Sequence, residues 1–147
     1  MLYIASDHGG FNLKNQLIDF VKNQQIDITD LGPFNLNNED DYPDFAVPLT
    51  EKITENLKEN KGILICRNGV GESIVANKIK GIRAALTWTP NHTMTARKDD
   101  DVNVIALPAD YIDLETAKQI VVTFLETAFS NDPKYARRLN KISEIEK

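Results

Sequence analysis

The stretch GILICRNGVGES, residues 62–73, decides the fold, because an apolar run with the composition of a strand leads into a glycine-rich turn that opens a helix. The turn begins at Cys66, the only cysteine of the chain, and Glu72 falls on the first turn of the expected helix. Free backbone N–H groups and the positive end of a helix dipole favour a thiolate over a thiol, and they also suit an anionic ligand. The stretch therefore predicts a reactive cysteine, with a buried structural cysteine at a strand end as the alternative.

Outward from this stretch, short apolar runs alternate with longer amphipathic ones. The apolar runs predict strands at Leu2–Ser6, Ile26–Leu31, Gly62–Cys66, Arg83–Trp88 and Asn103–Leu107. The amphipathic runs predict helices at Phe11–Asn23, Pro43–Glu59, Glu72–Lys78, Asn91–Lys98, Asp113–Ala128 and Lys134–Lys147. In the first helix, the apolar residues fall on one face and leave Lys14 for the solvent. This repeat of strand and helix predicts an α/β protein in which helices wrap a five-stranded parallel sheet.

Length and composition predict one domain over residues 1–147, whose last part, residues 131–147, forms an arm that we expect to pack on a partner subunit. The chain has 147 residues, 41% of them hydrophobic and 27% charged, which suffices for a single core. It has no run of roughly 20 apolar residues and no secretory pattern at its start, so we expect a soluble, cytoplasmic protein without a membrane partner. One cysteine excludes an internal disulfide, and the net charge of −5 argues against a nucleic-acid partner.

Ligands of open parallel sheets bind beyond the carboxyl ends of the strands, and this rule gathers scattered residues into one candidate site. The first strand ends in Asp7 and His8, and the third ends in Cys66. Tyr42 precedes a helix and is a candidate wall of the same pocket. Plainer interpretations are that Asp7 caps the next helix, that His8 is an edge residue, and that the segment around Tyr42 is a solvated turn.

A longer set of motifs resembles one enzyme family. The motifs are Ser6-Asp7-His8-Gly9-Gly10-Phe11 with Leu13-Lys14, Asp41-Tyr42-Pro43, Gly62-Ile63-Leu64-Ile65-Cys66, Gly69-Val70-Gly71, Ala76-Asn77-Lys78, Gly81-Ile82-Arg83-Ala84 and Asn103-Val104. In order and spacing they resemble the type B ribose-5-phosphate isomerases and their galactose-6-phosphate isomerase relatives. The resemblance implies a Rossmann-like three-layer α/β/α sandwich that works as a homodimer, or a tetramer, with shared active sites. It also implies aldose–ketose isomerisation of a sugar phosphate with no metal and no other cofactor.

The resemblance implies that a base removes the proton on C2 of the sugar and that the resulting enediolate is reprotonated on C1. One branch of the family uses a cysteine at Cys66 and another a glutamate at Glu72; this chain carries both, and we expect Cys66 to be the base. The loop Arg67–Gly71 and the Asn68 amide would stabilise the enediolate, one such donor being worth ~2.7–4 kcal/mol. The residues implied in substrate binding on this side are Asp7, His8, Tyr42, Arg67, Gly69, Val70 and Gly71.

The basic residues of the C-terminal arm are implied in phosphate binding across the subunit interface. Arg138 matches the second of two family arginines, and Lys134 replaces the first. A lysine contacts phosphate without the bidentate fork of arginine. Asp110 stands at a further phosphate arginine, so Arg67 or Arg137 is expected to compensate. A solvated terminal helix is the alternative interpretation of the arm.

A further departure concerns ring opening. Asp99 and Asp100 stand where the family has its ring-opening histidine and the asparagine after it. Because a carboxylate at Asp99 is expected to be ionised and to donate a proton poorly, slow ring opening is predicted. The charge run Lys98–Asp101 is also what an exposed surface would carry.

These features favour an isomerase of ribose 5-phosphate and ribulose 5-phosphate. The altered positions leave a second candidate, the same chemistry on a tetrose or hexose phosphate, because a tetrose phosphate needs no ring opening of the usual kind. A third is a non-catalytic sugar-phosphate-binding paralogue, although Cys66 and the glycine loop argue against it because a binding module needs no base. A cysteine-dependent phosphatase is excluded, because its arginine would stand where this chain has Glu72.

Overall fold

The computed structural model describes residues 1–146 and contains a five-stranded parallel sheet between helices. The strands are β1 (Leu2–Ser6), β2 (Ile28–Asp30), β3 (Lys61–Cys66), β4 (Ala84–Leu86) and β5 (Val104–Pro108), in the order β2-β1-β3-β5-β4. The helices are α1 (Phe11–Asn23), α2 (Pro43–Thr54), α3 (Val70–Ala76), α4 (Pro90–Asp100), α5 (Leu114–Glu126) and α6 (Pro133–Ile145), and a 3₁₀ turn, η1 (His8–Gly10), joins β1 to α1. Within residues 1–146, no helix has the length and hydropathy needed to cross a membrane.

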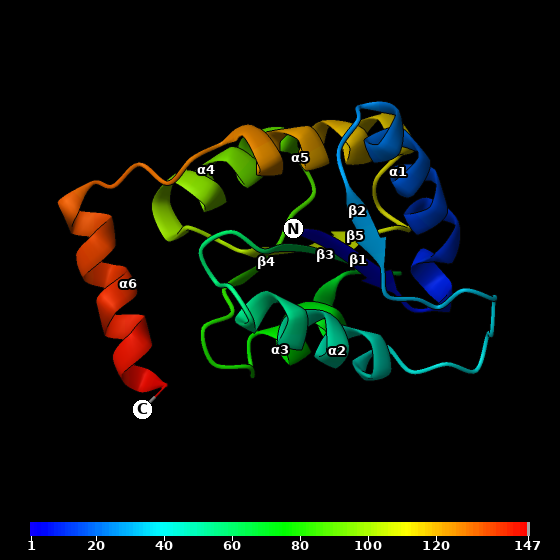
Figure 1. Cartoon of the computed structure of the whole chain (residues 1–147), viewed down its shortest axis with the longest axis horizontal. Coiled ribbons are helices and arrows are strands. Elements are labelled where there is room, and N and C mark those ends of the chain that lie inside the picture. The colour runs from blue at the N-terminus through cyan, green and yellow to red at the C-terminus, as the bar shows by residue number, and fades with distance from the viewer. Residues whose placement is uncertain (147) are drawn as a thin grey trace.

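Helices cover both faces of the sheet, with α1, α4 and α5 on one side and α2 and α3 on the other (Figure 1). Side chains of a strand alternate between its faces, so each central strand feeds two cores. In β3, Ile63 and Ile65 join the core that also holds residues of α1, α4 and α5, whereas Leu64 joins the core that holds residues of α2 and α3. The three-layer sandwich and the parallel sheet expected from the sequence are confirmed.

The strand register places the turns that follow β1 and β3 next to each other. All the pairings are parallel, with Ser6 opposite Ile65 and Cys66 opposite Pro108. The carboxyl ends of β1, β3 and β5 therefore meet at one edge of the sheet, which is where ligands of such folds bind.

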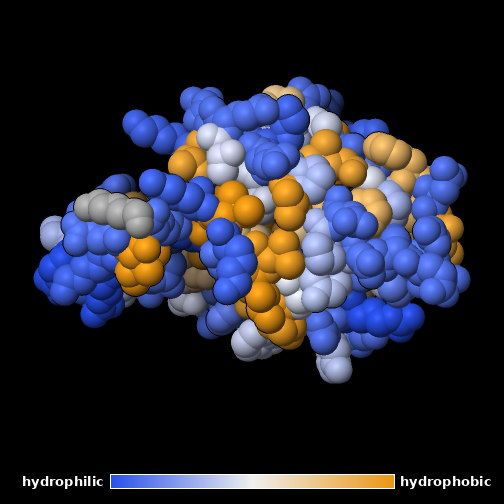
Figure 2. Space-filling model, turned by 90° about the horizontal axis from the view of Figure 1, so that it is seen from below, coloured by the Kyte–Doolittle hydropathy of each residue, from blue (hydrophilic) through white to orange (hydrophobic). Residues whose placement is uncertain are grey.

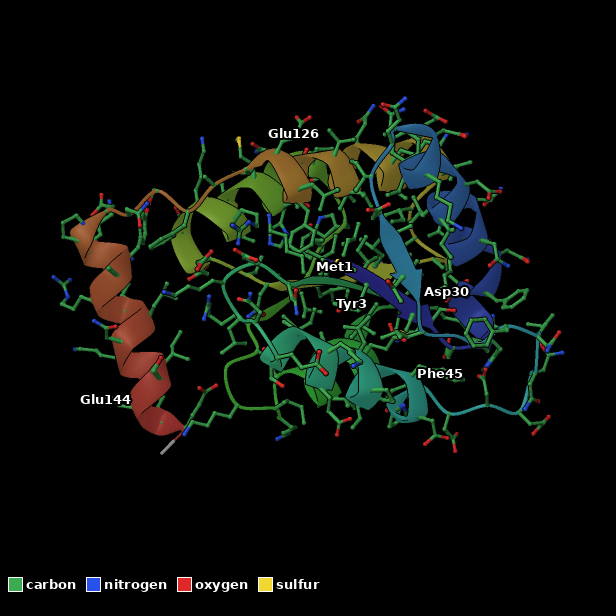
Figure 3. The ribbon with its side chains drawn as sticks, viewed as in Figure 1. Met1, Tyr3, Asp30, Phe45, Glu126 and Glu144 are labelled. Atoms are coloured by element: carbon green, nitrogen blue, oxygen red, sulfur yellow. The ribbon has the colours of Figure 1, made fainter. Side chains whose placement is uncertain are left out.

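The prediction that Lys14 faces the solvent is wrong, because this side chain is fully buried. Its Nζ donates to both carboxylate oxygens of Asp30 at 2.7 Å and to the carbonyl of Pro33 at 3.0 Å. Asp30 ends β2 beside α1 (Figure 3). Three acceptor oxygens, two on Asp30 and one on Pro33, satisfy the three donors of the ammonium group, which explains how the charge can be buried. The helical pattern did not contain this information, since the partners come from another strand and its loop.

The C-terminal helix α6 stands apart from the sandwich (Figure 1). Among the described residues, α6 contributes no buried side chain, and Ile142 and Ile145 on it are exposed. Its end is tied to the body where the carboxylate of Glu146 accepts the N–H of Gly81, at 3.1 Å from each oxygen. The helix is therefore amphipathic, with an apolar stripe that the rest of the chain leaves uncovered.

Candidate active site

The carboxyl edge of the sheet brings together the polar residues that follow β1 and β3. The N–H of Asp7 donates to the carbonyl of Ile65 at 3.2 Å, which joins the two turns. Oδ1 of Asp7 accepts the N–H groups of Gly9 at 2.8 Å and Gly10 at 3.2 Å, so Asp7 caps the 3₁₀ turn η1, while the N-cap of α1 is Gly10. Burial nevertheless raises the pKa of the Asp7 carboxyl, because the loss of solvent outweighs the two backbone hydrogen bonds.

Two glycines allow these turns to pack closely. A Cβ on Gly10 would run into the carbonyl oxygen of Ile65. Gly69 has a φ of 72°, in the left-handed region that favours glycine, and a Cβ there would lie 2.5 Å from Cδ1 of Leu86. The glycine-rich turn therefore sets the path of the chain from β3 into α3.

Cys66 lies at the end of β3 and is 4% exposed. Its Sγ accepts the N–H of Gly69 at 3.1 Å, and hydrogen bonding from the backbone of Glu72 also favours the thiolate. Burial outweighs both bonds and, with the nearby charge of Glu72, raises the pKa of the thiol to about 11. The backbone donors of the turn favour the thiolate, as expected, but desolvation has the larger effect and favours the thiol.

Glu72 lies on the first turn of α3 and is fully buried. Neither of its carboxyl oxygens has a hydrogen-bond partner among residues 1–146. Burial, with the charges of Asp7 and Asp40, raises the pKa of Glu72 well above its ordinary value, so the expectation that the helix terminus holds it ionised is wrong. A buried polar group without a partner costs roughly 1–3 kcal/mol, and such groups cluster at functional sites.

His8 is held by Asp40, a residue that the sequence reasoning missed. Oδ1 of Asp40 accepts the backbone N–H of His8 at 2.9 Å and lies 2.7 Å from Nδ1 of the same residue. This contact raises the pKa of His8, with a further contribution from Asp7. Asp40 belongs to an acidic run that reads as a solvated turn, and it is 32 positions from His8. Only the fold brings the two together.

Tyr42 and Asn68 flank the glycine-rich turn as expected. The Tyr42 ring packs on Gly71, where an added Cβ would lie 2.6 Å from Cζ. Oδ1 of Asn68 accepts the N–H of Val70 at 3.0 Å, which leaves its amide nitrogen as the group that can donate to a ligand. Val70 itself is exposed at the start of α3.

Arg67 reaches across the carboxyl edge. Its stem passes over Gly9, where an added Cβ would lie 2.5 Å from Cγ of Arg67. Its guanidinium is 3.6 Å from the carboxylate of Asp110, and the N–H of Asp110 donates to the Arg67 carbonyl at 2.9 Å. Its charge also acts on His8, whose pKa it lowers slightly against the effect of Asp40. An exposed arginine in this place is available to an anionic group of a ligand.

Asp99 and Asp100 do not meet Cys66 within one chain. They lie on the last turn of α4, which runs back toward the amino end of β5. There they line a groove of about 490 Å³ together with Ile142 and Glu146 from the α6 arm. Seen from below, α6 forms a lobe set apart from the body, and hydrophobic side chains gather on the body next to it (Figure 2).

The basic residues of the arm are exposed on α6. Nζ of Lys134 lies 4.7 Å from the ring centre of Tyr135, and the guanidinium carbon of Arg138 lies 5.5 Å from the same ring. Together with Arg137 and Lys141 they share one side of the helix at the spacing of a single face. The chain's own Cys66 lies on another part of the molecule, beneath the turn that opens α3.

Asp7, His8 and Asp40 form the one cluster of described residues whose ligand atoms lie close enough for a metal ion, within 4.8 Å of one another. Oδ1 of Asp7 and Oδ1 of Asp40 already accept backbone N–H groups. The cluster is therefore held together by its own hydrogen bonds.

Sequence comparisons find close similarity along the whole chain. The family model described as Ribose/Galactose Isomerase matches residues 2–142. The chain is 38% identical over 146 residues to a probable ribose-5-phosphate isomerase B of Mycoplasma genitalium, covering 99% of this chain and 95% of the relative. It is 35% identical over 143 residues to a D-erythrulose-4-phosphate isomerase of Pectobacterium atrosepticum, covering 97% and 93%.

The fold is also shared with solved structures. The crystal structure of ribose-5-phosphate isomerase B from Mycoplasma genitalium with bound ribulose 5-phosphate superposes with a TM-score of 0.95 at 38% identity, over 99% of this chain and 95% of that one. Similarity at this level extends over both the sandwich and the C-terminal helix.

Proposed function

Because this chain belongs to the ribose/galactose isomerase family, we propose that it interconverts ribose 5-phosphate and ribulose 5-phosphate. The observation that carries the proposal is the pair formed by Cys66 and Glu72, two ionisable groups buried at the head of a glycine-rich turn. The bound ribulose 5-phosphate of the Mycoplasma genitalium relative supports the five-carbon substrate. A binding protein would have no need to bury these two groups side by side.

In the proposed reaction, the proton on C2 of the open-chain aldose moves to a base, the hydroxyl proton on C2 moves to the oxygen on C1, and the proton held by the base returns to C1. We assign the base to Cys66, because it is the less deeply buried member of the pair, 4% exposed against 0% for Glu72. Burial raises the pKa values of both groups, and the charge of Glu72 contributes to the rise at Cys66, so the protonation of the thiol and that of the carboxyl are linked.

The enediolate is stabilised by the turn that holds the base. The Asn68 amide nitrogen and the N–H groups of the loop Arg67–Gly71 are the donors, since the carbonyl oxygen of Asn68 is already engaged by Val70. Tyr42 closes the side of the pocket by packing on Gly71. Asp7 and His8 bind the sugar phosphate from the turn after β1.

The remaining half of the site comes from a second copy of the chain. Lys134, Arg137 and Arg138 are exposed on a helix with an uncovered apolar stripe, and Asp99 and Asp100 lie away from Cys66. Packing of the arm on a partner would bury the stripe and bring these cations to the partner's phosphate site. The active form is then a homodimer, with a tetramer as the larger alternative.

A tetrose phosphate is the second candidate substrate, and one observation favours it. The relative from Pectobacterium atrosepticum is named a D-erythrulose-4-phosphate isomerase and is 35% identical. Asp99 places a carboxyl group where the resemblance implies a ring-opening imidazole, and a tetrose phosphate needs no furanose ring opening of the usual kind.

The experiment is turnover of a panel of tetrose, pentose and hexose phosphates by the full-length chain, followed as formation of the ketose or aldose partner. The proposal predicts the highest kcat/KM for ribose 5-phosphate or ribulose 5-phosphate. A higher kcat/KM for the tetrose phosphate would move the assignment to the second candidate. Binding of all three classes without turnover would contradict an isomerase.

A further inference from the structure

Asp40 contacts His8 at two atoms, and the proposed function gives this pair of contacts no role. A single carboxylate oxygen, Oδ1 of Asp40, meets both the backbone N–H and Nδ1 of His8, at 2.9 Å and 2.7 Å. The Asp40 side chain is 8% exposed, while that of His8 is 23% exposed. A buried carboxylate thus holds a partly open imidazole by its backbone and by its ring.

The loop that carries Asp40 is anchored at its other end. The ammonium group of Lys14 bonds Asp30 and the carbonyl of Pro33, and the N–H of Ser6 donates to the carbonyl of Gly32 at 3.0 Å. Next to Asp40, the chain enters α2 at Pro43. With both ends fixed, the loop can hold Asp40 in one place at low entropic cost.

The contact decides which nitrogen of His8 is left for a ligand. Nδ1–H is taken by Asp40, and Nε2 is the other polar atom of the ring. In the charged imidazolium, Nε2 carries a proton that can be donated to an oxygen of a phosphate or sugar. The same arrangement of carboxylate and histidine fixes the orientation of catalytic and metal-binding imidazoles in other proteins.

Charged groups from three segments face His8. Asp40 on the loop before α2 and Asp7 on the turn after β1 both raise its pKa, whereas Arg67 after β3 and partial desolvation lower it. Asp40 has the largest effect, through the hydrogen bond. Asp7 and Asp40 also act on Glu72, which lies beneath them. The upward shift in the pKa of His8 therefore depends chiefly on one residue.

We propose that Asp40 is a positioning residue that fixes the orientation of the His8 ring through Nδ1, so that Nε2–H donates to an anionic oxygen of the sugar phosphate. This inference rests on the proposed function and deepens it, because it assigns part of the anion binding to groups of one chain. His8 and Arg67 are then the cations that each chain supplies to its own site, while the α6 cations act on the partner. Asp40 itself touches no substrate.

The first test follows the titration of the two histidines by NMR, using the ring proton or carbon resonances of the full-length protein. His8 and His92 are the only histidines, so one His92→Gln variant assigns them. In Asp40→Asn, we expect the His8 midpoint to move to lower pH, because the carboxylate no longer favours the charged ring. The matched control is Glu39→Gln, which removes an exposed neighbouring charge and is expected to leave the midpoint in place. An unchanged midpoint in Asp40→Asn would overturn the positioning role.

The second test measures KM and kcat for ribose 5-phosphate across pH in the same variants. In Asp40→Asn, we expect KM to rise about tenfold near neutral pH, because the substrate loses one charge-assisted hydrogen bond from His8. The change in kcat should be smaller. The difference should shrink at lower pH, where the ring is charged in both proteins, and Asp40→Glu should restore part of it. A lower His8 midpoint with an unchanged KM would overturn the binding role of His8. Absence of turnover in the unsubstituted protein, with the expected NMR shift, would instead contradict the proposed function.

Discussion

The carboxyl edge of the sheet and the groove beside α6 are both lined by carboxylates, but only the first is closed. At the carboxyl edge, Asp7 and Glu72 are buried against Cys66, and their surroundings raise the pKa values of all three groups. In the groove, Asp99 is half-buried, Asp100 is exposed, and the helix opposite them has no buried side chain within residues 1–146. One chain thus buries the groups that we propose for proton transfer and leaves exposed the groups that we propose for phosphate binding. This difference supports our proposal that the site is divided between two copies.

The largest effect is expected from Cys66→Ala at the carboxyl edge of the sheet. Loss of the base should lower kcat by about 10²–10⁴-fold with little change in KM, measured with ribose 5-phosphate. The substituted side chain is small, so the melting temperature should fall only slightly and serves as the control for folding. An active Cys66→Ala together with an inactive Glu72→Gln would make Glu72 the base and Cys66 a packing residue.

Removal of α6 tests the role that we propose for the groove beside it and for the basic residues of the arm. A chain that stops after Asn131 should keep its sandwich, because α6 adds no buried side chain to the described core, but it should lose activity and the dimer. Circular dichroism shows whether the truncated chain is folded, and light scattering gives its mass and so shows whether it forms a dimer. A truncated protein with full activity would show that the arm has no part in the site.

A smaller effect on activity is expected from Arg138→Ala, a single substitution on α6. A charge-assisted hydrogen bond to phosphate contributes about 1.5–3 kcal/mol to binding, so its loss should raise KM roughly 10–150-fold. The fold should not change. Lys141→Ala, on the same exposed helix, is the matched control and should change KM much less. Equal effects of the two substitutions would reduce the role of Arg138 to general electrostatics.

The smallest effect concerns the influence of Glu72 on the pKa of Cys66. Glu72 raises the pKa of Cys66, which burial and this charge bring to about 11, so Glu72→Gln should lower that pKa and speed alkylation by iodoacetamide at pH 8 several-fold. Sugar phosphate should protect the thiol. Glu51→Gln, an exposed substitution on α2, controls for the change in net charge. Slower alkylation in Glu72→Gln would mean that Glu72 assists the thiolate instead of opposing it.

The fold followed from the sequence because its signals are local. Alternating apolar and amphipathic runs predicted the order of the strands and helices, and the predicted bounds of β1, residues 2–6, are confirmed. The predicted bounds of β2, β4 and α2 are wrong, because β2 and β4 are shorter than the apolar runs and α2 ends at Thr54. The carboxyl-edge rule also predicted that the turn after β1 lies beside the end of β3, where the N–H of Asp7 donates to the carbonyl of Ile65. These predictions need only the period of a strand or helix and the direction of a parallel sheet.

The parts that could not be predicted depend on long-range contacts and on burial. Lys14 fits an exposed helical position, and only the partner Asp30 on β2 explains its burial. Asp40 lies in a run that looks solvated, and the fold turns it onto His8. A helix dipole and backbone donors favour an ionised Cys66 or Glu72, but the depth of each side chain, which decides the pKa, is a property of the packed structure.

The division of the site is tested most directly by complementation between two differently tagged chains, purified as heterodimers. One chain carries Cys66→Ala and the other Arg138→Ala, and activity is measured at a substrate concentration well below the KM of the Arg138→Ala homodimer. A shared site predicts one intact site in each heterodimer, and therefore about half of the wild-type activity. A heterodimer of wild type with the Cys66→Ala, Arg138→Ala double variant should have little activity, because each of its sites carries one defect. A weak first heterodimer and a half-active second one would contradict the account, because they would place Cys66 and Arg138 in the same chain's site.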